Sequence, residues 1–103
     1  MLLIAIEITR TGLTVDGHAN YAESGKDIIC AAVSALTQGL IHSLEALTDD
    51  EVESRIRDGH VDIHYRDLSE RGTLLIDAFF IAVLDIQESY GESYVKVTVA
   101  DGR

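Results

Sequence analysis

The chain has 103 residues, 47% of them hydrophobic and 25% charged, which is the balance of a soluble folded domain and not of a disordered segment. Acidic residues outnumber basic ones by 18 to 8, so the formal net charge is −10. A surface this negative repels phosphate groups, which argues against direct binding of nucleic acid. The same charge attracts basic partners, although solubility accounts for it equally well.

The opening segment, MLLIAIEITR, is apolar, but it carries Glu7 and no basic residues precede its apolar part. It therefore reads as neither a signal peptide nor a membrane span. One cysteine cannot form an internal disulfide, which fits a reducing compartment. We expect a single domain over residues 1–103, located in the cytoplasm and without membrane contact.

Two strands account for the first 17 residues. In the first strand, every second residue is apolar: Leu2, Ile4, Ile6 and Ile8. A Thr11-Gly12 turn leads into the second strand, where Leu13 and Val15 share a face. This strand ends at Asp16-Gly17, so His18 follows a strand end and a permissive glycine.

A helix of about five turns is predicted next, because the apolar residues recur every three or four positions. They are Ile29, Val33, Leu36, Leu40, Leu44 and Leu47. Asp27 is the expected N-cap, with Ser24 as an earlier alternative. The acidic run Thr48-Asp49-Asp50 ends the helix.

The second half of the chain predicts a hairpin, a helix and a strand. Asp58-Gly59 separates residues 52–57 from 60–66, which is a strong signal for a two-residue β-turn. Ser69 can cap a helix that Gly91 terminates. Its expected apolar face comprises Leu75, Phe79, Ala82, Ile86 and Tyr90, and Val95, Val97 and Val99 form the last strand. The order ββαββαβ predicts an α+β fold, with two helices packed on a mostly antiparallel sheet.

Cys30 is the first candidate for chemistry. If Asp27 is the cap, Cys30 lies in the first helical turn, where the helix dipole and the N–H groups stabilise a thiolate. The carboxylate of Asp27 opposes this effect, and a base that becomes cationic, such as His18, would offset it. The alternative is a buried structural thiol, although Cys30 lies about 100° from the centre of the apolar stripe.

Three other histidines compete with His18. His42 is expected on a solvated flank of the first helix. His60 and His64 share a strand face with Asp62, which suggests a metal site, but two imidazoles and one carboxylate on a flat face make a poor cage. Only His18 ends a strand that leads to the start of the helix. Because the strand pair makes a poor cage, we expect no metal, and we expect no cofactor.

The segment Ala19 to Lys26 joins the two candidates and has no apolar period. It contains Tyr21 and Gly25, and it could form a cover over a bound peptide. A plain connector is the alternative.

The motif from Gly17 to Ala35, G-H-A followed by a short loop and G-K-D-I-I-C-A-A-V-S-A, resembles the signature of the ribosomal-processing cysteine protease family, Prp. The likeness also covers the chain's length, element order and acidity. In this family, the histidine corresponds to His18 and the cysteine to Cys30, while Asp27 and Ser34 also match motif positions.

The resemblance implies a cytoplasmic bacterial endopeptidase, typically a homodimer. Its substrate would be the basic precursor of ribosomal large-subunit protein twenty-seven, cut after an apolar, phenylalanine-rich N-terminal extension. The alternative from another class is a non-catalytic, ribosome-associated adaptor that binds a peptide along a sheet edge.

Overall fold

The computed structural model describes residues 3–17 and 26–100. The elements follow the predicted order: β1 (Ile4–Ile8), β2 (Gly12–Gly17), α1 (Lys26–Leu47), β3 (Val52–Arg57), β4 (His60–Tyr65), α2 (Glu70–Tyr90) and β5 (Val95–Val99). The predicted ββαββαβ order is therefore confirmed.

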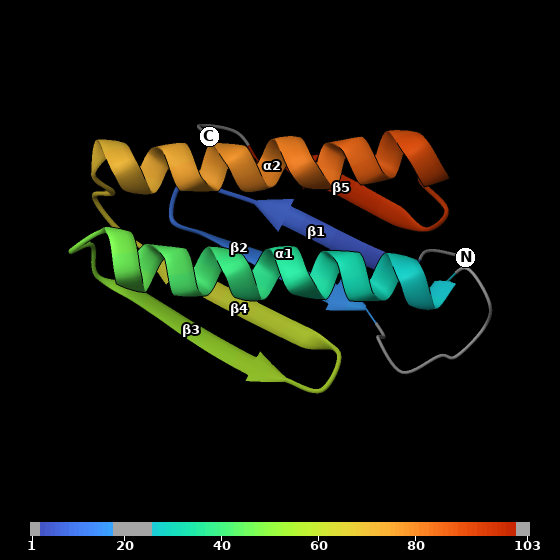
Figure 1. Cartoon of the computed structure of the whole chain (residues 1–103), viewed down its shortest axis with the longest axis horizontal. Helices are drawn as coiled ribbons and strands as arrows, with labels where there is room; N and C mark the ends of the chain where they lie inside the picture. Colours follow the sequence, from blue (N-terminus) through green and yellow to red (C-terminus); the bar gives the residue numbers. More distant parts are fainter. Residues whose placement is uncertain (1–2, 18–25, 101–103) are drawn as a thin grey trace.

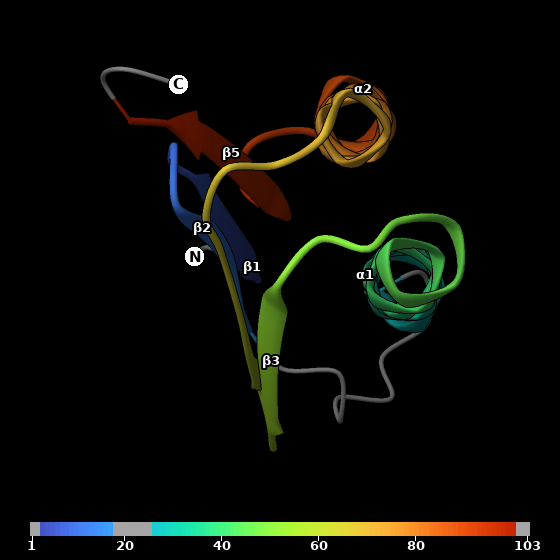
Figure 2. The same ribbon diagram turned by 90° about the vertical axis from the view of Figure 1, so that its left-hand side faces the viewer.

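The strands form one sheet in the order β3-β4-β2-β1-β5. Three neighbouring pairs are antiparallel, and only β1 and β5 run parallel. Both helices lie side by side on one face of this sheet (Figures 1 and 2). The predicted architecture, two helices on a mostly antiparallel sheet, is confirmed.

The core fills the space between the sheet and the two helices. Because side chains alternate along a strand, one face of each central strand supplies it. Ile4, Ile6 and Ile8 of β1 are buried there, together with Leu13 of β2. On β4, Ile63 and Tyr65 point the same way. The polar residues between them lie on the other face of the sheet.

Helix α1 buries a broader surface than its apolar stripe predicts. Ile29, Val33, Leu40 and Leu44 are buried as expected, whereas Leu47 is 53% exposed. Three residues that are not among the predicted apolar ones are also buried: Cys30, Thr37 and Ile41. The reason is that α1 packs against both the sheet and α2 (Figure 2). Its segment Ile28–Leu47 is long and apolar enough for a membrane span, but these buried side chains show that it serves as a core helix.

The start of α1 differs from the prediction. The helix begins at Lys26, so Asp27 lies in its first turn and the prediction that Asp27 is the N-cap is wrong. The alternative cap, Ser24, lies outside the described residues. Cys30 is consequently the fifth helical residue, at the start of the second turn.

Helix α2 is capped at both ends as predicted. The Ser69 side chain accepts a hydrogen bond from the Gly72 N–H, at 3.1 Å. The Asp50 carboxylate in turn accepts bonds from the Ser69 N–H and hydroxyl, at 3.0 and 2.8 Å. Gly91 ends the helix with a φ of 102°, a conformation that favours glycine.

The apolar face of α2 is rotated relative to the prediction. Phe79 is buried as expected, but its buried neighbours are Ile76 and Val83, each one residue beyond the predicted Leu75 and Ala82. Tyr90 is 50% exposed. The rotation follows from the packing of α2 on α1 and β5, which the spacing within the helix does not reveal.

Candidate active site

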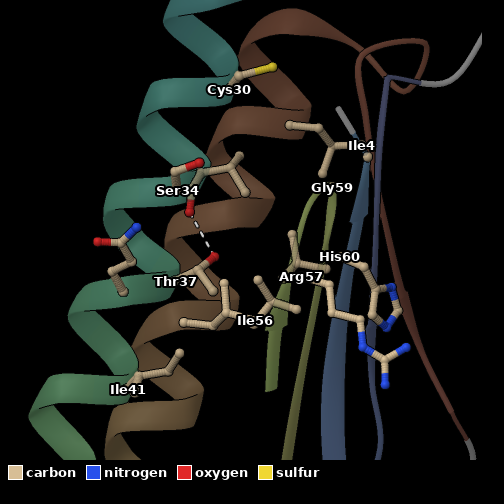
Figure 3. Close-up of a pocket in the computed structure, with 14 residues that line it drawn as sticks. Ile4, Cys30, Ser34, Thr37, Ile41, Ile56, Arg57, Gly59 and His60 are labelled. Carbon is tan, nitrogen blue, oxygen red and sulfur yellow. Dashed lines mark hydrogen bonds between the residues drawn. The ribbon is translucent and has the colours of Figure 1, made fainter. Parts of the chain in front are cut away.

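A cavity of about 150 Å³ lies between α1 and the sheet, beside the β3–β4 turn (Figure 3). Helix α1 lines one wall, from Cys30 near its start to Ile41. The opposite wall comes from the ends of β1 and β2 and from the β3–β4 hairpin. This wall includes Ile4, Val15, Gly17, Ile56, Gly59 and Val61.

Cys30 is buried, with 2% of its surface exposed, and its sulfur points from α1 towards the sheet side (Figure 3). The helix dipole acts mainly on the first turn. Because Cys30 follows that turn, the dipole contributes less to a thiolate than the predicted position implies. A nearby base is therefore more important for activating this cysteine.

Two further side chains of α1 line the same cavity. Ser34 follows Cys30 by one helical turn and is half-buried. Thr37 is buried, and its hydroxyl donates to the Val33 carbonyl at 2.7 Å. Because that bond satisfies the hydroxyl, Thr37 adds little polarity to the wall. Thr37 follows Val33 by four residues and precedes Leu40 by three, so it borders the apolar stripe, but its polar side chain gives no apolar signal.

Gly17 ends β2 at the cavity wall. Its φ is 152°, and a Cβ at this position would lie 2.3 Å from the Leu3 carbonyl oxygen. Any other residue would force the backbones of β1 and β2 apart. Only glycine therefore fits at this position, directly before His18. The structure thus brings Cys30, Ser34 and the residue preceding His18 to one cavity.

Several predicted site residues are not described by the structure. His18, Tyr21 and Gly25 lie outside the described residues, as does the side chain of Asp27. Their predicted roles stay predictions.

The competing histidines lie elsewhere. His42 is exposed on α1, as predicted. His60 borders the cavity through its position on β4, but its ring points to the sheet face opposite α1 (Figure 3). Its Nδ1 is 2.9 Å from an Asp16 carboxylate oxygen, and its Nε2 is 3.0 Å from one of Asp62.

These contacts bear on the metal hypothesis for His60 and His64. The hydrogen bonds to Asp16 and then Asp62 raise the pKa of His60 above its ordinary value of 6.5. Each ring nitrogen faces a carboxylate oxygen, so neither is directed at an open metal position. Within residues 3–17 and 26–100, no three His, Cys, Asp or Glu side chains gather as a metal site would require.

The family model described as "Cysteine protease Prp" matches residues 3–96 of the chain. The chain belongs to this family. It is therefore a cysteine protease, as the sequence predicts. The Prp signature quoted from the sequence, Gly17 to Ala35, lies inside the matched region.

Curated relatives carry the same family name. The ribosomal processing cysteine protease Prp of Staphylococcus aureus strain Mu50 is 28% identical over 86 residues, which cover 81% of each chain. The protein of that name from Mycoplasma genitalium is 49% identical over 37 residues, covering 36% of this chain and 37% of its own.

Two solved structures of the S. aureus protease share the fold. The complex with a substrate peptide has a TM-score of 0.86 and 25% identity, covering 95% of this chain and all (100%) of that one. The complex with a covalently linked product peptide has a TM-score of 0.84 and 27% identity, with the same coverage. The fold derived from the sequence is thus the fold of the Prp proteases.

Proposed function

We propose that the protein is an endopeptidase that removes the N-terminal extension of bacterial ribosomal large-subunit protein twenty-seven. Cys30 acts as the nucleophile, and His18 acts as general base and then general acid. One observation carries the proposal: Cys30 and Gly17, the residue before His18, line the same cavity. The names of the relatives, which are ribosomal processing cysteine proteases, support the substrate class.

The reaction follows the usual course of thiol proteases. His18 takes the thiol proton, and the sulfur attacks the scissile carbonyl carbon. The tetrahedral intermediate collapses to a thioester when His18 returns the proton to the leaving amine. Water, deprotonated by His18, then hydrolyses the thioester, which releases the acid and restores the thiol. Backbone N–H groups near the start of α1 are the proposed oxyanion donors.

A thiol as buried as Cys30 needs a cationic partner to ionise, which is the role proposed for His18. At 2% exposure, the thiol is shielded from bulk water. In such a setting, a thiolate and an imidazolium attract each other more strongly than they do in solvent. Ser34 and Asp27, which match motif positions, are proposed supporting residues near this pair.

The cavity fits the apolar residues of the proposed cleavage sequence. Val33, Ile41, Ile56 and Val61 give it an apolar lining. Ile56 is 63% exposed on β3, one of the two outer strands of the sheet, so an incoming peptide can reach it. An extended peptide can also pair with the edge of such a strand. Tyr21 and Gly25, in the segment that joins the catalytic pair, are proposed to cover the peptide.

The proposal also covers the location, the oligomeric state and the attraction of the substrate. We propose a cytoplasmic homodimer that needs neither metal nor cofactor. The net charge of −10 steers the basic ribosomal precursor towards it. The peptide-binding adaptor remains the second candidate, favoured by the exposed outer strand β3 and by the burial of Cys30.

The deciding experiment is incubation of the purified protein with the extended precursor, followed by mass measurement of the products. We expect a shortened ribosomal protein and a released N-terminal peptide. A complex that forms without cleavage would favour the adaptor. Labelling with iodoacetamide near neutral pH sharpens the result, because a catalytic Cys30 reacts faster than an ordinary thiol and a structural one reacts slowly.

A further inference from the structure

A histidine on the open face of the sheet bridges two strands through two carboxylates. His60 of β4 places Nδ1 2.9 Å from Asp16 of β2, and Nε2 3.0 Å from Asp62 of its own strand. Asp16 and His60 are direct partners in the β2–β4 register. A neutral ring donates from one nitrogen only, whereas a protonated ring can donate to both carboxylates.

The bridge lies where β2 ends. The Gly17 N–H donates to the Gly59 carbonyl at 2.9 Å, which ties the last residue of β2 to the β3–β4 turn. Gly59 directly precedes His60, and Asp16 directly precedes Gly17. The backbone bond and the side-chain bridge therefore hold the same point of the chain, and the next residue is His18.

We propose that His60 is a positioning residue for the cleavage reaction: its bridge to Asp16 fixes the end of β2, and hence the point from which His18 approaches Cys30. This inference rests on the proposed function, because it assumes that His18 is the base. His60 itself faces away from the cavity (Figure 3) and does not touch the reacting atoms. A small displacement of a catalytic group, of about 1 Å, can lower a rate by about a hundredfold.

The bridge between His60 and Asp16 anchors the end of β2, and this anchor depends on pH in a defined direction. The charged groups around His60 are Asp16 on β2, Asp62 on β4, Asp58 in the turn, and Arg57, its direct partner on β3. The hydrogen bonds to Asp16 and then Asp62 outweigh the desolvation of the ring and raise the pKa of His60. The bridge is therefore complete below pH 6.5, the ordinary pKa, and weakens as the pH rises through the higher pKa of the folded state.

Three substitutions separate the two arms of the bridge. His60→Asn keeps a donor near the Nδ1 position, facing Asp16, whereas His60→Gln keeps one near the Nε2 position, facing Asp62. His60→Ala removes both. The matched control is His64→Gln, on the same strand face but opposite Gly12, at the other end of β2.

Two readouts are needed. The first is kcat and KM for cleavage of the extended ribosomal precursor, measured across pH. The second is hydrogen exchange of the Gly17 amide, which reports the anchor whether or not the protein cleaves anything. We expect His60→Ala and His60→Gln to lower kcat by about ten- to a hundredfold and to speed Gly17 exchange. His60→Asn should retain more of both, and His64→Gln should match the wild type. Above the pKa of His60, wild-type kcat should fall towards that of His60→Asn, because a neutral ring keeps one N–H donor and loses the other.

The outcomes are distinguishable. Unchanged Gly17 exchange in His60→Ala overturns the anchor. Faster Gly17 exchange with unchanged kcat overturns the positioning role, and so does an equal effect of the Asn and Gln variants. If the wild type cleaves no precursor, the proposed function fails, and with it the role of His60 in cleavage, while Gly17 exchange still decides whether the anchor exists.

Discussion

The two helices have nearly the same length, 22 and 21 residues, but their first turns lie in different surroundings. Helix α2 starts with a complete cap, in which Ser69 accepts from the Gly72 N–H and Asp50 holds Ser69. Helix α1 starts beside the cavity, and Cys30 in its second turn faces that space (Figure 3). A donor that is used in a cap cannot stabilise a substrate oxyanion. The capped start of α2 therefore serves stability, whereas the start of α1 lies near the cavity in which we propose that cleavage occurs.

The largest effect is expected at Cys30. Cys30→Ser should leave the fold intact and lower cleavage by more than about a hundredfold, because a serine hydroxyl is far harder to ionise than a thiol. Mass spectrometry of the precursor measures the loss, and circular dichroism checks the fold. Retention of more than about a hundredth of the wild-type rate would remove Cys30 from the mechanism.

His18 comes next. His18→Ala should reduce kcat by about a hundredfold, the usual scale for a lost general base. The matched control is His42→Ala, an exposed histidine on α1 that we expect to be neutral. Equal losses in the two variants would contradict the assignment of His18 as the base.

A smaller effect on substrate binding is expected at the cavity. Ile56 and Ile81 are similarly exposed, at 63% and 60%, but only Ile56 lines the cavity. Ile56→Ala should raise KM by about tenfold with little change in kcat, because lost apolar contact weakens binding of substrate and transition state alike. Ile81→Ala, on α2, should change neither constant. An unchanged KM in Ile56→Ala would mean that the substrate binds elsewhere.

The smallest effect on cleavage is expected at the α2 cap. Ser69→Ala should lower the free energy of unfolding by about 1 kcal/mol, the typical value of an N-cap. Cleavage by the folded protein should not change, since Ser69 holds only α2 and its Asp50 partner. Urea unfolding gives the first quantity and initial rates give the second. A drop in kcat would show that the two helix ends are not as separate as the structure indicates.

Local patterns determined most of the elements. The alternation in β1, the Asp58-Gly59 turn and the cap at Ser69 each depend on residues close together in the chain, so the sequence predicts them correctly. The motif around Cys30 likewise indicates the chemistry before any fold is known. These features need only short-range physics: strand periodicity, permissive glycines and the unpaired amides of a helix start.

The pairing of distant strands and the burial of several helix residues could be learned only from the tertiary structure. The parallel pairing of β1 with β5 depends on where α2 returns the chain, and the burial of Cys30, Thr37 and Ile41 depends on α1 packing against both the sheet and α2. The sequence suggests that His60 and His64 form a pair, but the partner of His60 on β2 is Asp16, 44 residues away. No spacing within one strand reveals such a partner, because the pairing of β2 with β4 places the two residues together. The sequence determined which residues can do chemistry, and the packing of α1 on the sheet decided which of them share a cavity.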